Sequence, residues 1–278
     1  MADLGLHVGE RDIVAARVQD GRVTCYSRAP WEGPGHSADT FVGRIVEASG
    51  NLNTNNLDPV WIVPPPGFVH LRRIPLEIAG ERDRRKHLAW EAGQTLGHPV
   101  EDIVLRHWAS GSSAIWEAVR ADLVAHITRR LEEVGLKLGG LCAEPVALYH
   151  ALLDESHTWR AGVALSTDWI SIAAGTERAL VLAESFRIDT ASKESLEDLA
   201  DLVASRIRGR GERFASFSVA GQADDQLDAF AQHLSAAAGI EAPLLAAPAS
   251  DISEEHAPLT RIALAAGATR SSHTGIQP

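Results

Sequence analysis

The sequence pattern that most limits the fold of this chain is a β-hairpin signature that occurs twice, half a chain apart. Two short apolar runs, Val163–Leu165 and Ile170–Ala174, are joined by a polar turn at Ser166–Trp169. The same pattern stands near the N-terminus, about 157 positions earlier, in the runs Leu4–Val8 and Ile13–Val18. A hairpin repeated at this distance predicts two structurally similar halves that face each other across a cleft.

Composition and charge argue against several classes of protein. The chain has 278 residues, 45% hydrophobic and 23% charged, which is enough for one large domain or two lobes. Its formal net charge of -11 argues against a nucleic-acid-binding protein. The isolated Cys25 and Cys142 predict reduced thiols rather than a disulfide framework or a zinc site. Because there is no signal-peptide pattern and no run of about 18 apolar residues, we expect a cytoplasmic protein without a membrane span.

Each half is predicted to begin with three strands followed by a helix. In the first half, Asp20-Gly21 is a strong two-residue hairpin turn between the second and third strands. The predicted elements are strands Leu4–Val8, Ile13–Val18 and Val23–Ser27 with helix Ser37–Ser49, and strands Val163–Leu165, Ile170–Ala174 and Ala179–Ile188 with helix Ser192–Arg208. Between the halves we expect strands Val60–Val63 and Phe68–Ile74, and near the C-terminus a short strand Ile240–Leu245.

Seven short motifs follow one another along nearly the whole chain. They are Gly5-Leu-His-Val-Gly9, Arg72-Arg73-Ile74-Pro75-Leu76, Leu88-Ala-Trp-Glu91-Ala92, Pro99-Val-Glu-Asp102, Glu133-Val-Gly-Leu136, Glu144-Pro-Val-Ala-Leu148 and Arg261-Ile-Ala-Leu-Ala-Ala-Gly267-Ala268. In this order and spacing the chain resembles the PilM family, the cytoplasmic actin-like proteins of type IV pilus assembly. It is also similar to the related cytoplasmic part of type II secretion protein L.

This resemblance implies an α/β chain with an actin-like (ribonuclease H-like) fold of two lobes. The first lobe would span residues 1–155 and would contain an inserted PilM-type subdomain at about 60–120. The second, reduced lobe would span residues 160–270 and would lack the lid subdomain that normally follows its third strand. Residues 271–278 are expected to form a disordered tail.

The chain departs from the family at the positions that would hold a nucleotide. An actin-like ATPase needs an Asp on its first hairpin to organise Mg²⁺, which prefers hard oxygen ligands, and an Asp-x-Gly on its second hairpin. A Gly-Gly pair normally contacts the adenosine. The corresponding, vestigial positions here are His7, Gly9, Ala164, Ser166, Gly221 and Gln222. We therefore expect no catalytic residue, no cofactor and no metal in this cleft.

Three local patterns leave alternatives open. His7 and Asp168 could face each other as an acid–base or metal pair, or His7 could simply be hydrogen-bonded near the end of its strand. Trp169 could stack on a ring-shaped ligand or pack on the core. The basic start of the helix Glu81–Leu96 could bind an acidic partner or be a solvated face, and the basic run Arg206–Arg213 reads as a solvated helix end.

The resemblance implies a non-catalytic adaptor or scaffold at the inner face of the inner membrane. Its partner would be the short cytoplasmic tail of an inner-membrane assembly protein, lying in a groove between the inserted subdomain and the first-lobe sheet. Arg72, Arg73 and Arg85 would flank this groove. The alternatives are a divergent actin-superfamily ATPase or sugar kinase, or an unrelated α/β binding module, and a homodimer is left open.

Overall fold

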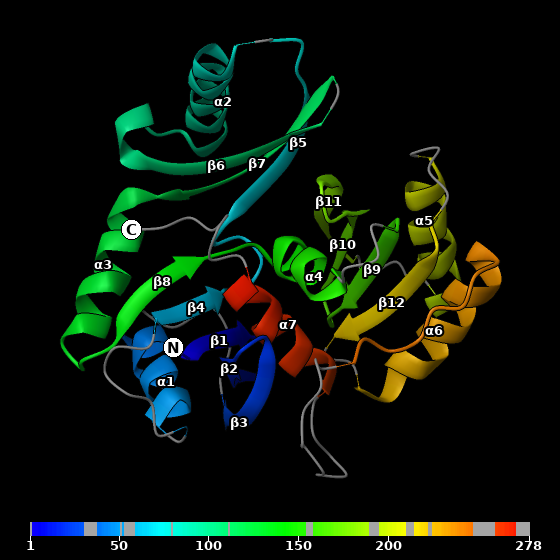
Figure 1. Ribbon diagram of the computed structural model, residues 1–278, viewed down its shortest axis with the longest axis horizontal. Helices are drawn as coiled ribbons and strands as arrows, with labels where there is room; N and C mark the ends of the chain where they lie inside the picture. Colours follow the sequence, from blue (N-terminus) through cyan, green and yellow to red (C-terminus); the bar gives the residue numbers. More distant parts are fainter. Residues whose placement is uncertain are drawn as a thin grey trace.

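The computed structural model describes residues 2–30, 38–50, 52, 59–78, 80–110, 112–153, 158–188, 195–209, 214–221, 224–246 and 259–270. These residues form three β-sheets with helices packed around and between them (Figure 1). In these ranges, every helix is too short or too polar to cross a bilayer. The sequence predictions for Ser37, Gln222 and residues 271–278 fall outside the described residues.

The N-terminal hairpin begins a five-stranded sheet with the order β3-β2-β1-β4-β8. Strands β1, β2 and β3 are antiparallel, whereas β4 and β8 run parallel to β1. Asp20 and Gly21 both have positive φ angles, 51° and 75°, as the predicted two-residue turn requires. The strands are β1 (Ala2–Val8), β2 (Asp12–Gln19), β3 (Arg22–Pro30), β4 (Pro59–Val63) and β8 (Lys137–Leu141).

The second hairpin begins a four-stranded sheet with the order β11-β10-β9-β12. Here β9, β10 and β11 are antiparallel and β12 runs parallel to β9, just as β4 runs parallel to β1 in the other sheet. The predicted hairpin repeat is therefore confirmed. The strands are β9 (Arg160–Leu165), β10 (Trp169–Thr176), β11 (Ala179–Arg187) and β12 (Ser216–Gly221). The expected strand Ile240–Leu245 is wrong, because Leu244 makes only a single bridge to Val219.

A separate three-stranded antiparallel sheet has the order β5-β7-β6 and is covered by helix α2 (Figure 1). It does not contain Val60–Val63, which we expected in the same inserted unit. Those residues belong to β4, where Val60 pairs with Leu4 of β1, so the separate sheet begins only at His70. Its elements are β5 (His70–Pro75), α2 (Glu81–Leu96), η1 (Val100–Asp102), β6 (Ile103–Ser110) and β7 (Ser113–Arg120).

The helices define two lobes with a pair of helices between them (Figure 1). The first lobe is the five-stranded sheet with α1 and α3, and the second lobe is the four-stranded sheet with α5 and α6. Helices α4 and α7 pack on each other; α7 contacts strands of both lobes, and α4 contacts β9, β10 and β11 of the second lobe. The helices are α1 (Ala38–Gly50), α3 (Ala121–Glu132), α4 (Glu144–Leu152), α5 (Leu196–Arg208), α6 (Asp224–Ala238) and α7 (Leu259–Arg270).

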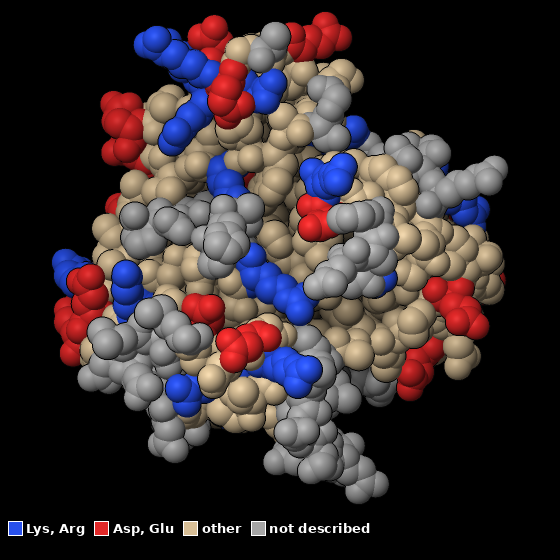
Figure 2. All heavy atoms as spheres, in the orientation of Figure 1, with Lys and Arg blue, Asp and Glu red and all other residues tan. Residues whose placement is uncertain are grey.

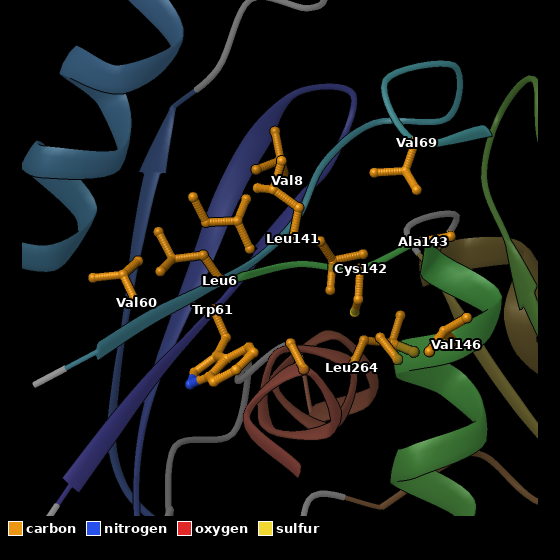
Figure 3. Packing of buried hydrophobic residues seen from close by; sticks show 14 of the residues in the cluster. Leu6, Val8, Val60, Trp61, Val69, Leu141, Cys142, Ala143, Val146 and Leu264 are labelled. Carbon is orange, nitrogen blue, oxygen red and sulfur yellow. The ribbon is translucent and has the colours of Figure 1, made fainter. Parts of the chain in front are cut away.

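The core sits where α4 and α7 meet the first-lobe sheet. Figure 3 shows Leu6, Trp61, Val146 and Leu264 directed into one buried cluster. Helix α7 approaches β1 so closely that a Cβ on Gly5 would lie 1.8 Å from the carbonyl oxygen of Ala265. Only glycine fits there, and this tight packing carries the residues of α7 into the junction between the lobes.

Candidate functional site

The turns of the two repeated hairpins touch each other at the junction between the lobes. The backbone N–H of Asp168 donates a hydrogen bond to Oε1 of Glu10, at 3.3 Å. Each turn is also closed on itself, from Gly9 N to Asp12 O at 2.8 Å and from Ser166 N to Trp169 O at 2.9 Å. The resemblance places bound phosphate groups between these turns, and here the turns contact one another instead.

His7 lies directly behind this contact in a buried hydrogen-bond chain. Its Nε2 is 2.8 Å from Oε1 of Glu144, the first residue of α4. The other carboxylate oxygen of Glu144 accepts a hydrogen bond from Oγ of Ser171 in β10, at 2.5 Å. His7 and Ser171 belong to different lobes, so the Glu144 carboxylate joins the two lobes.

Arg261 of α7 completes the buried cluster. Its Nε donates to Nδ1 of His7 at 3.2 Å, and its Nη2 donates to the carbonyl oxygen of Asp12 at 3.1 Å. The Arg261 guanidinium also pairs with the Asp12 carboxylate, whose other oxygen pairs with Arg28. All of these side chains except Arg28 are less than 10% exposed.

The donors and acceptors fix the charge of each group. A guanidinium can only donate, so Nδ1 of His7 must accept and its proton must stand on Nε2, facing Glu144. Burial lowers the pKa of His7 and keeps the imidazole neutral. Burial alone would raise the pKa of Glu144, but the hydrogen bonds from His7 and Ser171 outweigh it and the pKa is lowered. The carboxylates of Asp12 and Glu144 thus balance the guanidinium groups of Arg28 and Arg261 around the neutral imidazole of His7.

The residues present do not fit a nucleotide-bound Mg²⁺. Such an ion needs several hard oxygen ligands in an octahedral array. The four carboxylate oxygens of Asp12 and Glu144 are already engaged by protein donors. Ala164 and Ser166 of the second hairpin are buried and carry no carboxylate. What the arrangement does chemically is to join the lobes through the hydrogen bonds of the Glu144 carboxylate to His7 and Ser171.

The structure decides one of the open alternatives. Among the described residues no hydrogen bond or ion pair joins His7 and Asp168: the ring nitrogens of His7 face Glu144 and Arg261, and the Asp168 carboxylate lies 3.9 Å from Arg187. His7 is a hydrogen-bonded histidine at the end of its strand, as the plainer alternative had it. Trp169 is half-buried and lines a surface depression with Glu144 and Pro145, rather than packing wholly in the core.

A groove of about 540 Å³ lies between the three-stranded sheet and the second lobe. Its walls are the edge strands β5 and β11, each of which has a paired strand on one side only. This is not the predicted position, because the second wall is β11 rather than the first-lobe sheet. The lining residues are Leu71, Arg72, Arg73, Ile74, Pro75, Ser112, Ser113, Leu182, Ala183, Glu184 and Ser185.

Only two of the three predicted partner-binding arginines lie at this groove. Arg72 and Arg73 are on β5, whereas Arg85 lies on the outer face of α2 beside Arg82 and Lys86. Arg72 and Arg73 point to opposite faces of their sheet, because neighbouring strand residues alternate. Nη2 of Arg73 donates to Oγ of Ser113 at 3.1 Å, and among the described residues Arg72 has no ion pair.

The three-stranded sheet is tied to the lobe junction by a second buried carboxylate. Glu117 of β7 is fully buried and accepts a hydrogen bond from the backbone N–H of Ala143, at 3.0 Å, immediately before α4. Nη1 of Arg106 lies 3.3 Å from the same carboxylate. Burial raises the pKa of Glu117 to about 7, although Arg106 and the Ala143 N–H act in the opposite direction.

Sequence reasoning did not single out Glu144, Arg261 or Glu117 as site residues. A signal was present for Arg261, which stands in the first turn of α7 among small and apolar residues, with Arg270 as the other charge at the end of the helix. A charge on a helix of that composition is buried and needs a partner. Nothing comparable marks Glu117, whose partners come from distant parts of the chain.

Comparison with known proteins identifies the fold. No family model matches the chain, and no curated protein matches it. Among solved structures, the chain is similar to a chain of the PilM–PilN type IV pilus biogenesis complex, with 16% identity over 99% of each chain and a TM-score of 0.68.

Two further solved structures have the same architecture. The cytoplasmic domain of EpsL, an inner-membrane component of the type II secretion system of Vibrio cholerae, has 10% identity over 100% of this chain and 97% of its own, with a TM-score of 0.56. A Bacteroides thetaiotaomicron protein with an actin-like ATPase fold and unknown function has 12% identity over 89% of this chain and 92% of its own, with a TM-score of 0.56. The chain therefore has the two-lobed, actin-like fold of the PilM and EpsL type that its sequence predicted.

Proposed function

We propose that this protein is a non-catalytic adaptor of a pilus or secretion machine. The observation that carries this proposal is the lobe junction, where all four carboxylate oxygens of Asp12 and Glu144 are engaged by protein donors and are not free to organise a nucleotide-bound metal. The hydrogen bond from Asp168 to Glu10 lies between the hairpin turns, where the resemblance places phosphate groups. A protein with this fold and this junction serves as a scaffold rather than as an ATPase.

The partner in this proposal is the cytoplasmic tail of an inner-membrane assembly protein. One structure of similar fold belongs to a complex of PilM with PilN, and another is the cytoplasmic part of an inner-membrane component. Edge strands with unpaired backbone groups, such as β5 and β11, accept an added extended segment. The adaptor would act in the cytoplasm, at the inner face of the inner membrane.

The proposal is tested by measuring how tightly the protein captures such a tail. Fluorescence anisotropy would use labelled synthetic tails of the single-span membrane proteins encoded beside this chain. One of these tails should bind, and replacing Arg72 and Arg73 together by Glu should weaken that binding at least about tenfold without lowering the melting temperature. Arg85→Glu, on the far side of α2, should have a smaller effect.

The matched control is the double substitution Arg22→Glu with Arg208→Glu. It changes the net charge by the same amount, and among the described residues neither arginine has an ion pair. Arg206 is unsuitable as a control, because it lies 3.0 Å from the carboxylate of Glu184, which lines the groove. Equal loss of binding in the control and in the β5 variant would contradict the proposed site.

A further inference from the structure

The groove between β5 and β11 does not end at the three-stranded sheet. A second depression, of about 250 Å³, lies at the point where β5 begins. Leu71 and Ser185 line both depressions, so the two adjoin, and together they are called the channel. The second depression is lined by Pro64, Pro65, Pro66, Gly67, Val69, His70, Leu71, Ala143, Glu144, Pro145, Trp169 and Ser185.

The two ends of this channel differ in chemistry. At one end, Arg72 and Arg73 stand with the hydroxyl groups of Ser112 and Ser113. At the other end, the bend of Pro64–Pro66 faces the half-buried ring of Trp169. The carboxylate of Glu144 at that end is fully engaged by His7 and Ser171, so proline and indole surface is what it offers a ligand.

An edge strand runs along the channel. β5 has six residues, which at about 3.3 Å per residue spans about 20 Å. β5 and β11 are both edge strands, and the outward backbone groups of one of them can pair with an added strand. A compact ligand such as a free anion would use only one end of such a channel.

Charge favours an acidic group at the arginine end. The protein as a whole is acidic, and in Figure 2 acidic and basic side chains are interspersed without a large patch of one sign. Attraction of an acidic segment therefore depends on local cations rather than on the overall field. The one carboxylate among the residues that line this end, Glu184, is paired with Arg206.

We infer that the channel recognises an extended segment with a carboxylate at one end and a proline or large apolar side chain toward the other. The carboxylate would lie against Arg72, which has no ion pair among the described residues, and the apolar residue would lie against Trp169 and Pro66. This inference rests on the proposed function, because it describes the tail that the adaptor would bind. It also explains why an edge strand carries two neighbouring arginines beside a hydrophobic bend.

The test is a selection of random twelve-residue peptides displayed on phage, with the intact protein as bait. Peptides enriched by the unaltered protein should carry Asp or Glu toward one end and Pro, Trp or Leu toward the other. The double variant Arg72→Glu, Arg73→Glu should instead enrich Lys or Arg and keep the apolar preference. Trp169→Ala should lose the apolar preference and keep the acidic one, and the Arg22→Glu, Arg208→Glu control should select as the unaltered protein does.

A second measurement needs no protein variant. In the tightest enriched peptide, exchange of the acidic residue for Lys should weaken binding to the unaltered protein at least about tenfold. Peptides that bind without any acidic or apolar preference, or whose preferences are the same in the Arg72→Glu, Arg73→Glu variant, would overturn the inference and leave the adaptor proposal standing. If no peptide is enriched and no natural tail binds, both proposals are wrong.

Discussion

At the scale of single residues, the junction between the two hairpins is filled by a buried cluster of hydrogen-bonded side chains. The sequence alone predicts the loss of the metal site, because His7 and Ala164 stand where carboxylates are required. It does not predict the replacement, since Arg261 reaches His7 and Asp12 only through the packing of α7 against β1. The absence of an Asp at position 7 can be read from the motif Gly5–Gly9. The contacts of Arg261 with His7 and Asp12 depend on the tertiary structure.

Arg261→Met tests how much the contacts of Arg261 contribute to the stability of the protein. The substitution removes a guanidinium from the buried Asp12 carboxylate and from Nδ1 of His7. Leaving a buried charge with too few partners costs about 3–5 kcal/mol, so the free energy of unfolding from urea denaturation should fall by about that amount.

The matched control for this substitution is Arg28→Met, at the other oxygen of Asp12. Arg28 is 55% exposed and its ion pair is screened by water, so its loss should cost less than about 1 kcal/mol. Replacing Asp12 by Leu in the Arg261→Met background should recover part of the stability. Equal effects of the two arginine substitutions would mean that Arg261 is not an internal counter-ion.

At the scale of elements, local patterns predicted most of the strands and helices but not how they are grouped. The repeated hairpin and the Asp20-Gly21 turn were readable because both depend on neighbouring residues. The assignment of Val60–Val63 to the inserted unit was wrong, because these residues pair in parallel with β1. Such a pairing between distant segments produces no pattern in the local sequence. The hydrogen bond from the Ala143 N–H to Glu117 could not be predicted for the same reason.

The pH dependence of stability tests the Glu117 link. Its pKa is about 7 in the folded protein against an ordinary 4.5, so the folded state holds a proton that the unfolded chain releases between these values. The contribution of Glu117 is full below about pH 4.5 and is lost as the pH rises through about 7. The free energy of unfolding, relative to Glu117→Gln, should fall by on the order of 3 kcal/mol from about pH 5 to about pH 8.

The comparison with the variant is needed because His150 acts in the opposite direction. Burial, with Arg106 and Arg270 nearby, lowers the pKa of His150 to about 3, so its contribution is lost as the pH falls below 6.5. Subtracting the curve of Glu117→Gln removes this background. A difference between the two curves that does not change with pH would show that Glu117 titrates normally and that the link is weak.

At the scale of the whole molecule, the two-lobed fold was predictable and the position of the groove was not. The order of motifs along the chain was enough to identify the actin-like architecture, which the solved structures confirm. The groove depends on how the three-stranded sheet leans on the second lobe, so that β5 faces β11. Such packing between distant units follows from the sum of many contacts, which no motif encodes.

The adaptor proposal requires that the junction between the hairpins does not bind a nucleotide. Isothermal titration of the protein with ATP and Mg²⁺, at about 50 μM protein, tests this requirement most directly. We predict no heat of binding, because the carboxylate oxygens of Asp12 and Glu144 are engaged by protein donors and Glu10 contacts Asp168 between the turns. A dissociation constant near 1 μM, equivalent to about -8 kcal/mol, would contradict it and would favour a divergent ATPase or sugar kinase.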